Sequence, residues 1–355
     1  MRKLQCTPVN VPLATPIRTA SGDVTHAPLI LLDLITEEGI EGRGYLFTYT
    51  PLALKSVCSL IDELAQLLKG ATCSPHDVES MLDAKFRLLG NTGLITMAIA
   101  GIDMAIWDAL AKSVSLPLST LLGGTPRPIP AYFSQGMDGL ERGEALAEQC
   151  VKQGFELMKI KIGYPTVDND VAVIQAVQSV LNGHAKLAVD YNQSLTVPEA
   201  MSRCRVLDEL ELAWIEEPTR QEDIHGHARI AEEVKTSIMI GENWFGTHEM
   251  ARSIAANASD LVMPDLMKIG GVSGWLRASA LARDSRLPMC SHLFQEITSH
   301  LMCVTPTAHY LEVLDIAGPI LTTPLQIADG NAIPSQQPGS GLEWDTEAID
   351  KYVAS

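Results

Sequence analysis

Ionisable residues recur between residues 159 and 312 at intervals of 20 to 29 residues, each at the end of a short apolar run. An interval of this length holds one strand and one helix of a parallel (β/α) barrel, whose chemistry lies at the carboxyl ends of its strands. We therefore expect these side chains to meet at one end of such a barrel. The series, with the polar residues that accompany it, is Lys159 and Lys161, Asp190 and Asn192, Glu216 and Glu217, Glu242, Asp265 and Lys268, His292 and Glu312.

Acidic residues fall on three consecutive predicted strands. Asp190, Glu216 or its neighbour Glu217, and Glu242 would point to a common centre. Three carboxylates without His or Cys describe an oxygen site, which favours Mg²⁺ over Zn²⁺. One such acid alone is more often part of an ion pair, but three in register favour a metal site. Since neighbours on a strand face opposite ways, only one of Glu216 and Glu217 points inward, and the pattern leaves the choice open.

Candidate bases lie on both sides of these acids. Lys159 and Lys161 project to the same side of one strand, and near a divalent cation we expect each ammonium to lower the pKa of the other until a neutral amine forms near pH 7. His292 lies several strands further on, and although a lone His is more often structural, Asp265 could fix its tautomer. Glu312 lies among apolar residues, where a protonated carboxyl could donate a hydrogen bond to a developing negative charge.

This set of groups suits removal of the proton alpha to a carboxylate. A divalent cation and a protonated acid would stabilise the enediolate charge as it forms. A base on each face would then allow the proton to be removed from one enantiomer and returned to make the other.

The elements that must position these residues form an alternating pattern. Amphipathic segments such as 144–153 and 198–210 separate eight apolar runs, which predicts a parallel (β/α) barrel. The runs are 128–134, 157–163, 186–192, 212–218, 237–242, 261–267, 288–293 and 309–314.

The rest of the chain has a different pattern. Residues 1–50 are typical of strands and turns, and 51–124 are typical of helices, of which 97–107 is apolar nearly all round and expected to be buried. We predict a capping domain at 1–125, a barrel at 126–319, and a segment at 320–355, rich in Pro and Gly, that returns to the capping domain.

Composition restricts the class of protein. Lys and Arg number 26 against 43 Asp and Glu, a net charge of −17, which disfavours binding to nucleic acid or to anionic membranes. Seven scattered cysteines without a C-x-x-C pair indicate neither disulfides nor a zinc site. We find no apolar h-region near the start and no run long enough to span a bilayer, and so expect a cytoplasmic protein without a membrane partner.

Several segments resemble the mandelate racemase/muconate lactonizing enzyme family of the enolase superfamily, most closely its mandelate racemase branch. The similarity runs along almost the whole chain and includes NVPLATP, GYLFTYTP and AGIDMAIWDAL. The segments that carry the active-site positions are MKIKIGYP, VDYNQSL, WIEEPT, IGENWFG, MPDLMKIGGVSGW, SHLFQEI and HYLEVLD.

The resemblance implies a modified (β/α)7β TIM-type barrel with an N-terminal α+β capping domain, and it implies roles for single residues. Mg²⁺ would be bound by Asp190, Glu216 and Glu242. Lys161 would be the base for the S enantiomer, and His292, paired with Asp265, the base for the R enantiomer. The remaining roles are contact with the substrate carboxylate for Lys159, general acid for Glu312, and supporting hydrogen bonds for Ser134 and Asn192.

The resemblance also places the substrate pocket. Tyr49, Leu293 and Leu314 match the family's pocket wall. In the loop at 15–26, which would cover the pocket, Ile17 and Val24 stay apolar, whereas Ser21 stands where the branch has a valine and the loop as a whole is more polar.

Three functions are weighed on these residues. Because Lys161 and His292 are both present, we predict two-base racemisation of a mandelate-like 2-hydroxy acid by a homo-oligomeric enzyme. The alternative is an acid-sugar dehydratase that forms a 2-keto-3-deoxy acid, with His292 helping to expel a hydroxyl. A barrel that binds sugar acids without turnover is disfavoured, since no catalytic residue is missing.

Overall fold

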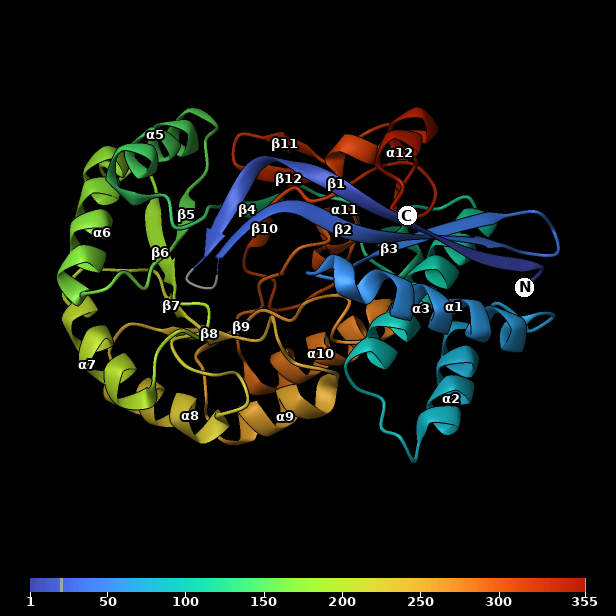
Figure 1. Cartoon of the computed structure of the whole chain (residues 1–355), viewed down its shortest axis with the longest axis horizontal. Helices are drawn as coiled ribbons and strands as arrows, with labels where there is room; N and C mark the ends of the chain where they lie inside the picture. Colours follow the sequence, from blue (N-terminus) through green and yellow to red (C-terminus); the bar gives the residue numbers. More distant parts are fainter. Residues whose placement is uncertain (20–21, 355) are drawn as a thin grey trace.

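The computed structural model describes residues 1–19 and 22–354 and has two parts. In Figure 1 the N-terminal part (blue to teal) is an antiparallel sheet with helices packed on it, and the second part (green to orange) is a ring of strands inside a ring of helices. The predicted α/β barrel with an N-terminal α+β capping domain is confirmed.

The capping domain begins with three antiparallel strands paired in the order β1-β2-β3. The apolar run at 29–35 lies inside β2 and is almost completely buried, because the helices cover this sheet. The strands are β1 (Lys3–Thr19), β2 (Gly22–Ile35) and β3 (Glu41–Phe47), and the helices are the short 3-10 turn η1 (Pro51–Ala53), α1 (Leu54–Leu68), α2 (Pro75–Phe86), α3 (Leu94–Ser113) and α4 (Leu118–Leu121).

Helix α3 is buried nearly all round, as predicted from its sequence. It has the length and the mean hydropathy (1.6) of a membrane span, so the expectation that no run reaches that length is wrong. In this fold 78% of the 18-residue stretch of α3 with that hydropathy is buried inside the protein. Gly42 of β3 lies so close to α3 that a Cβ there would come within 2.1 Å of the carbonyl oxygen of Ala105. The composition of α3 is therefore accounted for by its place in the core.

Parallel strands form the barrel wall in the order in which they occur in the chain, and the last one, β10, pairs with β4. The strands are β4 (Ile129–Ser134), β5 (Leu157–Lys161), β6 (Lys186–Asp190), β7 (Ile215–Glu216), β8 (Ile238–Ile240), β9 (Leu261–Val262) and β10 (Leu311–Val313). The helices between them are α5 (Gly139–Lys152), α6 (Val167–Leu181), α7 (Val197–Leu207), α8 (Ile224–Glu233), α9 (Thr247–Ala255), α10 (Gly271–Ser285) and α11 (Gln295–Met302).

The predicted strand at 288–293 is not a regular strand. It makes isolated parallel bridges, from Met289 to Val262 and from His292 to Asp265. Pro288 at its start has no N–H to donate to a ladder, and the segment is too short to recover regular pairing before α11 begins. Its backbone is nevertheless hydrogen-bonded to the segments on both sides, so it occupies the seventh place in the ring.

The segment from residue 318 onward contacts both parts of the molecule. After the 3-10 turn η2 (Gly318–Ile320), β11 (Gln326–Ala328) and β12 (Asn331–Ile333) form a hairpin that pairs with β4 of the barrel. Helix α12 (Thr346–Tyr352) then packs on β1 of the capping domain.

The far end of the β1–β2 hairpin reaches the barrel at the carboxyl ends of its strands (Figure 1). The carbonyl of Arg18 accepts a hydrogen bond from the N–H of Met137 at 2.8 Å. A Cβ on Gly136 would lie 2.8 Å from the backbone nitrogen of Arg18, so only glycine permits this approach. The capping domain thus extends to the end of the barrel where the polar residues lie.

Tyr45 of β3 and Glu296 of α11 form a buried contact between the two parts. The Tyr45 hydroxyl donates to Glu296 Oε2 at 2.7 Å. Burial, and then the nearby charge of Asp315, raise the pKa of Glu296 to about 7. A carboxyl with a raised pKa stabilises the folded state fully below its ordinary pKa and loses that contribution as pH rises through the folded value.

We therefore expect Glu296→Gln to be more stable than the parent protein at pH 8, by about 2 kcal/mol. The amide can accept the Tyr45 hydrogen bond without a buried charge, and the advantage should shrink toward pH 5. Urea unfolding at both pH values measures the difference, with the exposed Glu347→Gln as the control. A difference that does not change with pH would contradict the raised pKa.

Candidate active site

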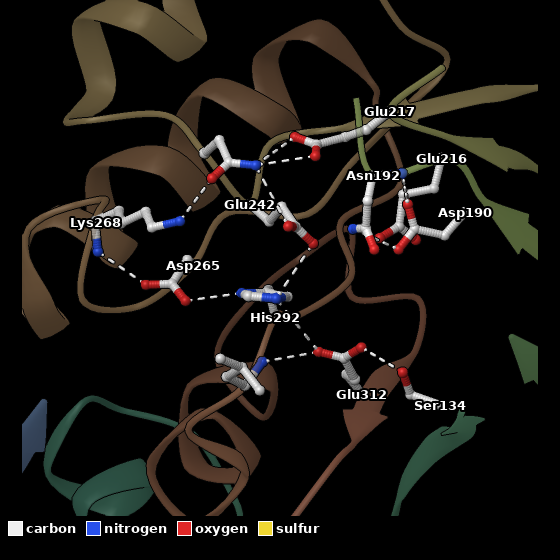
Figure 2. A network of polar contacts seen from close by, with 12 residues as sticks. Ser134, Asp190, Asn192, Glu216, Glu217, Glu242, Asp265, Lys268, His292 and Glu312 are labelled. Atoms are coloured by element: carbon white, nitrogen blue, oxygen red, sulfur yellow. Dashed lines mark hydrogen bonds and ion pairs between the residues drawn. The ribbon is translucent and has the colours of Figure 1, made fainter. Parts of the chain in front are cut away.

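Three acids meet at the carboxyl ends of neighbouring strands. Asp190 ends β6, Glu216 ends β7, and Glu242 follows β8. One oxygen of each lies within 4.8 Å of the others, and all three residues are buried. Figure 2 shows these side chains facing one another. Because Asp190 and Glu216 are paired in the β6–β7 register, the barrel itself sets their spacing.

Two lysines of β5 reach the same acids. Lys161 Nζ lies 2.5 Å from Asp190 Oδ2. Lys159 Nζ lies 2.9 Å from Glu216 Oε1 and 3.1 Å from Glu312 Oε1. Both lysines point into the barrel, as their spacing of two along a strand predicts.

The lowered pKa predicted for the lysines applies to a site with a divalent cation bound, and without the cation their pKa values move in the opposite direction. Burial and the neighbouring Lys159 both lower the pKa of Lys161. The surrounding carboxylates raise it by a larger amount, so the net pKa lies above the ordinary value. Burial likewise lowers the pKa of Lys159, and carboxylates led by Glu216 raise it well above the ordinary value. The mutual effect of the two ammonium groups is therefore present but smaller than that of the acids.

His292 stands on the other side of the acids. Its Nδ1 lies 2.8 Å from Asp265 Oδ2, and its Nε2 lies 3.2 Å from Glu242 Oε2 (Figure 2). Burial lowers the pKa of His292, but the carboxylates, led by Glu242, raise it above the ordinary value. The Asp265–His292 pair has the geometry that the sequence predicted.

Glu312 is buried and accepts two hydrogen bonds. Ser134 Oγ donates to Oε1 at 2.8 Å, and the N–H of Leu293 donates to Oε2 at 3.0 Å. Burial raises the pKa of Glu312, but Lys159, His292 and these hydrogen bonds lower it to about 2. The predicted protonated state is therefore wrong for the protein without substrate, because two cationic groups face this carboxyl.

The acids have a composition that fits a hard divalent cation. Asp190, Glu216 and Glu242 supply only oxygen atoms, which is the ligand set of Mg²⁺. Asn192 donates to both oxygens of Asp190, at 2.7 Å from its backbone and 3.0 Å from its side chain, and so orients that carboxylate. One buried oxygen at the site, Asn192 Oδ1, has no hydrogen-bond donor within the protein, which fits a ligand from outside the chain.

Some of the apolar residues predicted for the pocket wall can be placed through Ser134 and Glu312. Ile17 of the hairpin and Leu314 line a cavity of about 200 Å³ together with Ser134. Val24 is the cross-strand partner of Ile17. Leu293 is buried and contacts Glu312 through its backbone. Ser21, also predicted for this wall, lies outside the described residues.

Tyr49 enters the site from the capping domain. The residue is 40% exposed, and burial and then the charges of Asp265 and Glu242 raise its pKa well above the ordinary value. Its ring packs on Phe47, with 4.4 Å between centroids. Tyr49 is therefore half-exposed at the edge of the site and lies within the field of its carboxylates.

Sequence reasoning missed one set of contacts next to the acids. Asn243 Nδ2 donates to both oxygens of Glu217 at 2.9 Å, and Lys268 Nζ donates to Asn243 Oδ1 at 2.7 Å. Strand alternation had left one of Glu216 and Glu217 facing outward. The backbone of Glu217 has φ 39°, so the strand has already ended, and both side chains are buried.

Family comparisons agree with this architecture. Residues 1–123 match the family described as "Mandelate racemase / muconate lactonizing enzyme, N-terminal domain", and residues 143–348 match "Enolase C-terminal domain-like". The chain belongs to the mandelate racemase/muconate lactonizing enzyme family.

Relatives within this family carry out different reactions. A solved structure of an enolase from Bradyrhizobium, complexed with magnesium and mandelic acid, is 43% identical, has a TM-score of 0.97, and matches 100% of this chain and 98% of its own. L-talarate/galactarate dehydratase of Salmonella typhimurium is 29% identical over 95% of this chain and 87% of its own length. A 3,6-anhydro-alpha-L-galactonate cycloisomerase of Streptomyces coelicolor is 29% identical over 95% and 96%. Membership of the mandelate racemase/muconate lactonizing enzyme family therefore does not choose between racemase and dehydratase.

Proposed function

We propose that this protein is a Mg²⁺-dependent racemase of a bulky, mandelate-like 2-hydroxy acid. The observation that carries the proposal is that two possible bases, Lys161 and His292, contact different acids of the proposed metal site. Lys161 lies 2.5 Å from Asp190, and His292 lies 3.2 Å from Glu242. A substrate whose carboxylate binds at the acids would have one base on each side of its alpha carbon, which is what inversion requires.

The metal site would be made by Asp190, Glu216 and Glu242. A bound Mg²⁺ would offset the negative charge that develops on the substrate carboxylate. The positive charge of such an ion would offset the effect of these carboxylates, which raise the pKa of Lys161. Burial and the neighbouring Lys159 would remain, and both would lower that pKa toward the range of a base.

Lys159 and Glu312 would act together on the substrate carboxylate. Lys159 Nζ lies 3.1 Å from Glu312 Oε1 and is the first of the cations that lower the pKa of Glu312. A substrate carboxylate that draws Lys159 to itself weakens this effect, so burial can then favour the protonated Glu312. Ser134 and the Leu293 N–H hold the carboxyl in place for donation.

Two observations support a bulky 2-hydroxy acid. The relative with 43% identity was crystallised with mandelic acid. Ile17 and Leu314 line a cavity together with Ser134, whose hydroxyl donates to Glu312, so apolar side chains lie close to the acidic site. We also propose that the enzyme is a homo-oligomer, as capped barrels often are.

An acid-sugar dehydratase is the second candidate, and the similarity to L-talarate/galactarate dehydratase favours it. In that reaction His292 would donate its proton to a leaving hydroxyl. The hairpin residues between Ile17 and Val24 are more polar than a purely apolar lid, which suits a polyol.

Incubation of candidate acids with the enzyme in D₂O separates these functions. A racemase exchanges the alpha hydrogen and forms the other enantiomer with the carbon skeleton intact, whereas a dehydratase releases a 2-keto-3-deoxy acid. Proton NMR and chiral chromatography measure both outcomes over a panel of aromatic hydroxy acids and sugar acids. If none of these acids exchanges or loses water, both functions are wrong.

Removal of the divalent ion is expected to abolish exchange. After treatment with EDTA the rate should fall by more than about 10³-fold and return when Mg²⁺ is added, because the carboxylate charge is then no longer offset. Exchange that persists in EDTA, with metal content verified by elemental analysis, would contradict the assignment of the three acids.

A further inference from the structure

Lys268 is a buried cation that no carboxylate neutralises directly. It is 6% exposed, and within residues 1–19 and 22–354 its ammonium forms no ion pair within 4.0 Å. Instead it donates to Asn243 Oδ1 at 2.7 Å and lies 4.3 Å from the centroid of the Tyr49 ring. Figure 2 shows Lys268 next to Asp265, at the edge of the catalytic group. Burial of an ammonium is unfavourable unless such contacts hold it.

The ammonium fixes the orientation of Asn243. Since an ammonium group only donates, the Asn243 side chain must turn its oxygen to Lys268 and its NH₂ toward the carboxylates. That NH₂ contacts both oxygens of Glu217 at 2.9 Å and Glu242 Oε1 at 3.3 Å. Lys268 thus determines that the Asn243 side chain presents its NH₂, and not its oxygen, to Glu242.

The same ammonium holds a residue of the capping domain. Tyr49 has φ 57°, an unfavourable backbone conformation for a non-glycine residue, so its position depends on contacts made by the side chain. Those contacts are Phe47 on its own domain and Lys268 on the barrel. A cation over the face of a tyrosine ring is attractive, and more so in a desolvated place.

We propose that Lys268 is a positioning residue that fixes the capping-domain wall of the pocket to the barrel. Its ammonium holds the Tyr49 ring on one side and the Asn243–Glu217 pair on the other. The consequence for substrate binding rests on the proposed function, because it takes Tyr49 as part of the substrate pocket. The contact itself does not depend on which acid is turned over.

Lys268→Met should raise KM for the exchanged acid by about tenfold while kcat falls less than about threefold. The substitution removes the charge but keeps the length of the stem. Lys161 and His292 keep their partners, and Asp265 still accepts from the backbone N–H of residue 268. Lys268→Arg retains a cation that can stack on an aromatic ring, so its KM should rise less. Equal increases in KM for both variants, or an unchanged KM in Lys268→Met, would overturn the proposal.

A double-mutant cycle tests the contact without any substrate. Tyr49→Leu removes the ring, and because Tyr49 is 40% exposed this variant is expected to fold. Urea midpoints of the parent, Lys268→Met, Tyr49→Leu and the double variant should be non-additive, with the double variant losing less stability than the sum of the two single losses, because only the Lys268–Tyr49 contact is counted in both. In a second cycle with Tyr49→Phe, which keeps the ring face, Lys268→Met should retain its full effect. Additive midpoints in the first cycle would refute the contact, whereas failure of every acid to exchange would refute only the proposed function.

Discussion

Lys161→Ala is expected to stop exchange of the alpha hydrogen from the S enantiomer and to leave exchange from the R enantiomer measurable. His292→Asn should give the opposite result. Each variant loses one base, and general base catalysis accounts for a factor of about 10²–10⁴, so we expect a fall of about 10³-fold on one face only. Racemisation needs both bases and should be lost in both variants.

The contacts of the two bases explain why the loss should be confined to one face. Lys161 is bound to Asp190, and His292 lies between Asp265 and Glu242, so neither base contacts the other. Removal of one leaves the partners of the second unchanged. Proton NMR in D₂O with each pure enantiomer measures the two rates separately.

Lys152→Ala serves as a control for the loss of a lysine, since this residue ends α5 on the outside of the barrel and is exposed. Magnesium titration of the variants by calorimetry shows whether the acids still bind the ion. Equal loss for both enantiomers in both variants, with magnesium binding intact, would mean that the two residues do not act on opposite faces.

Much of this site follows from the sequence because a barrel converts spacing into position. Strand pairing places Asp190 opposite Glu216, and the β5 register places Lys161 opposite Asp190, so residues far apart in the chain come into contact through backbone geometry alone. The period of one strand and one helix was visible in the sequence even where β7 and β9 are only two residues long.

Side-chain ionisation and the contacts beyond the strand ends could not be read in the same way. The pKa of Glu312 depends on the distances from its carboxyl to Lys159 and His292, which spacing does not give. Glu217 departs from strand alternation because its backbone is left-handed. Its partner Asn243 and the cation Lys268 come from two different loops, so no local motif joins them.

Glu216→Gln is expected to make the protein without metal more stable at pH 8 and at the same time to abolish its stabilisation by Mg²⁺. Burial, and then the charge of Asp190, raise the pKa of Glu216 well above its ordinary value even though Lys159 is 2.9 Å away. Because the folded protein disfavours the ionised form, the stability of the fold decreases as pH rises and Glu216 ionises. The amide has the same shape and still offers an oxygen to Lys159.

The order of the two melting temperatures should therefore reverse when magnesium is added. Without metal the variant should melt roughly 2–4 °C above the parent for each kcal/mol gained. With Mg²⁺ at 100 times its Kd the parent gains about 2.7 kcal/mol, and the variant, which lacks one of three acidic ligands, gains little. Calorimetric scans with EDTA and with Mg²⁺ measure both.

Glu217→Gln is the matched control for this reversal. Glu217 is the next residue, is equally buried, and also has a pKa raised by burial and then by the charge of Glu242. It lies outside the group of three acids, so its substitution should keep the gain from magnesium. Its effect without metal is measured beside this gain, because relief of the buried charge is opposed by the loss of one of the two oxygens that accept from Asn243. If both variants kept that gain, Glu216 would not be a ligand. If only Glu217→Gln lost it, the ligand would be the other acid of the pair. If the order of melting temperatures reverses only for Glu216→Gln, the same carboxylates that destabilise the fold without metal are the ones that bind the ion.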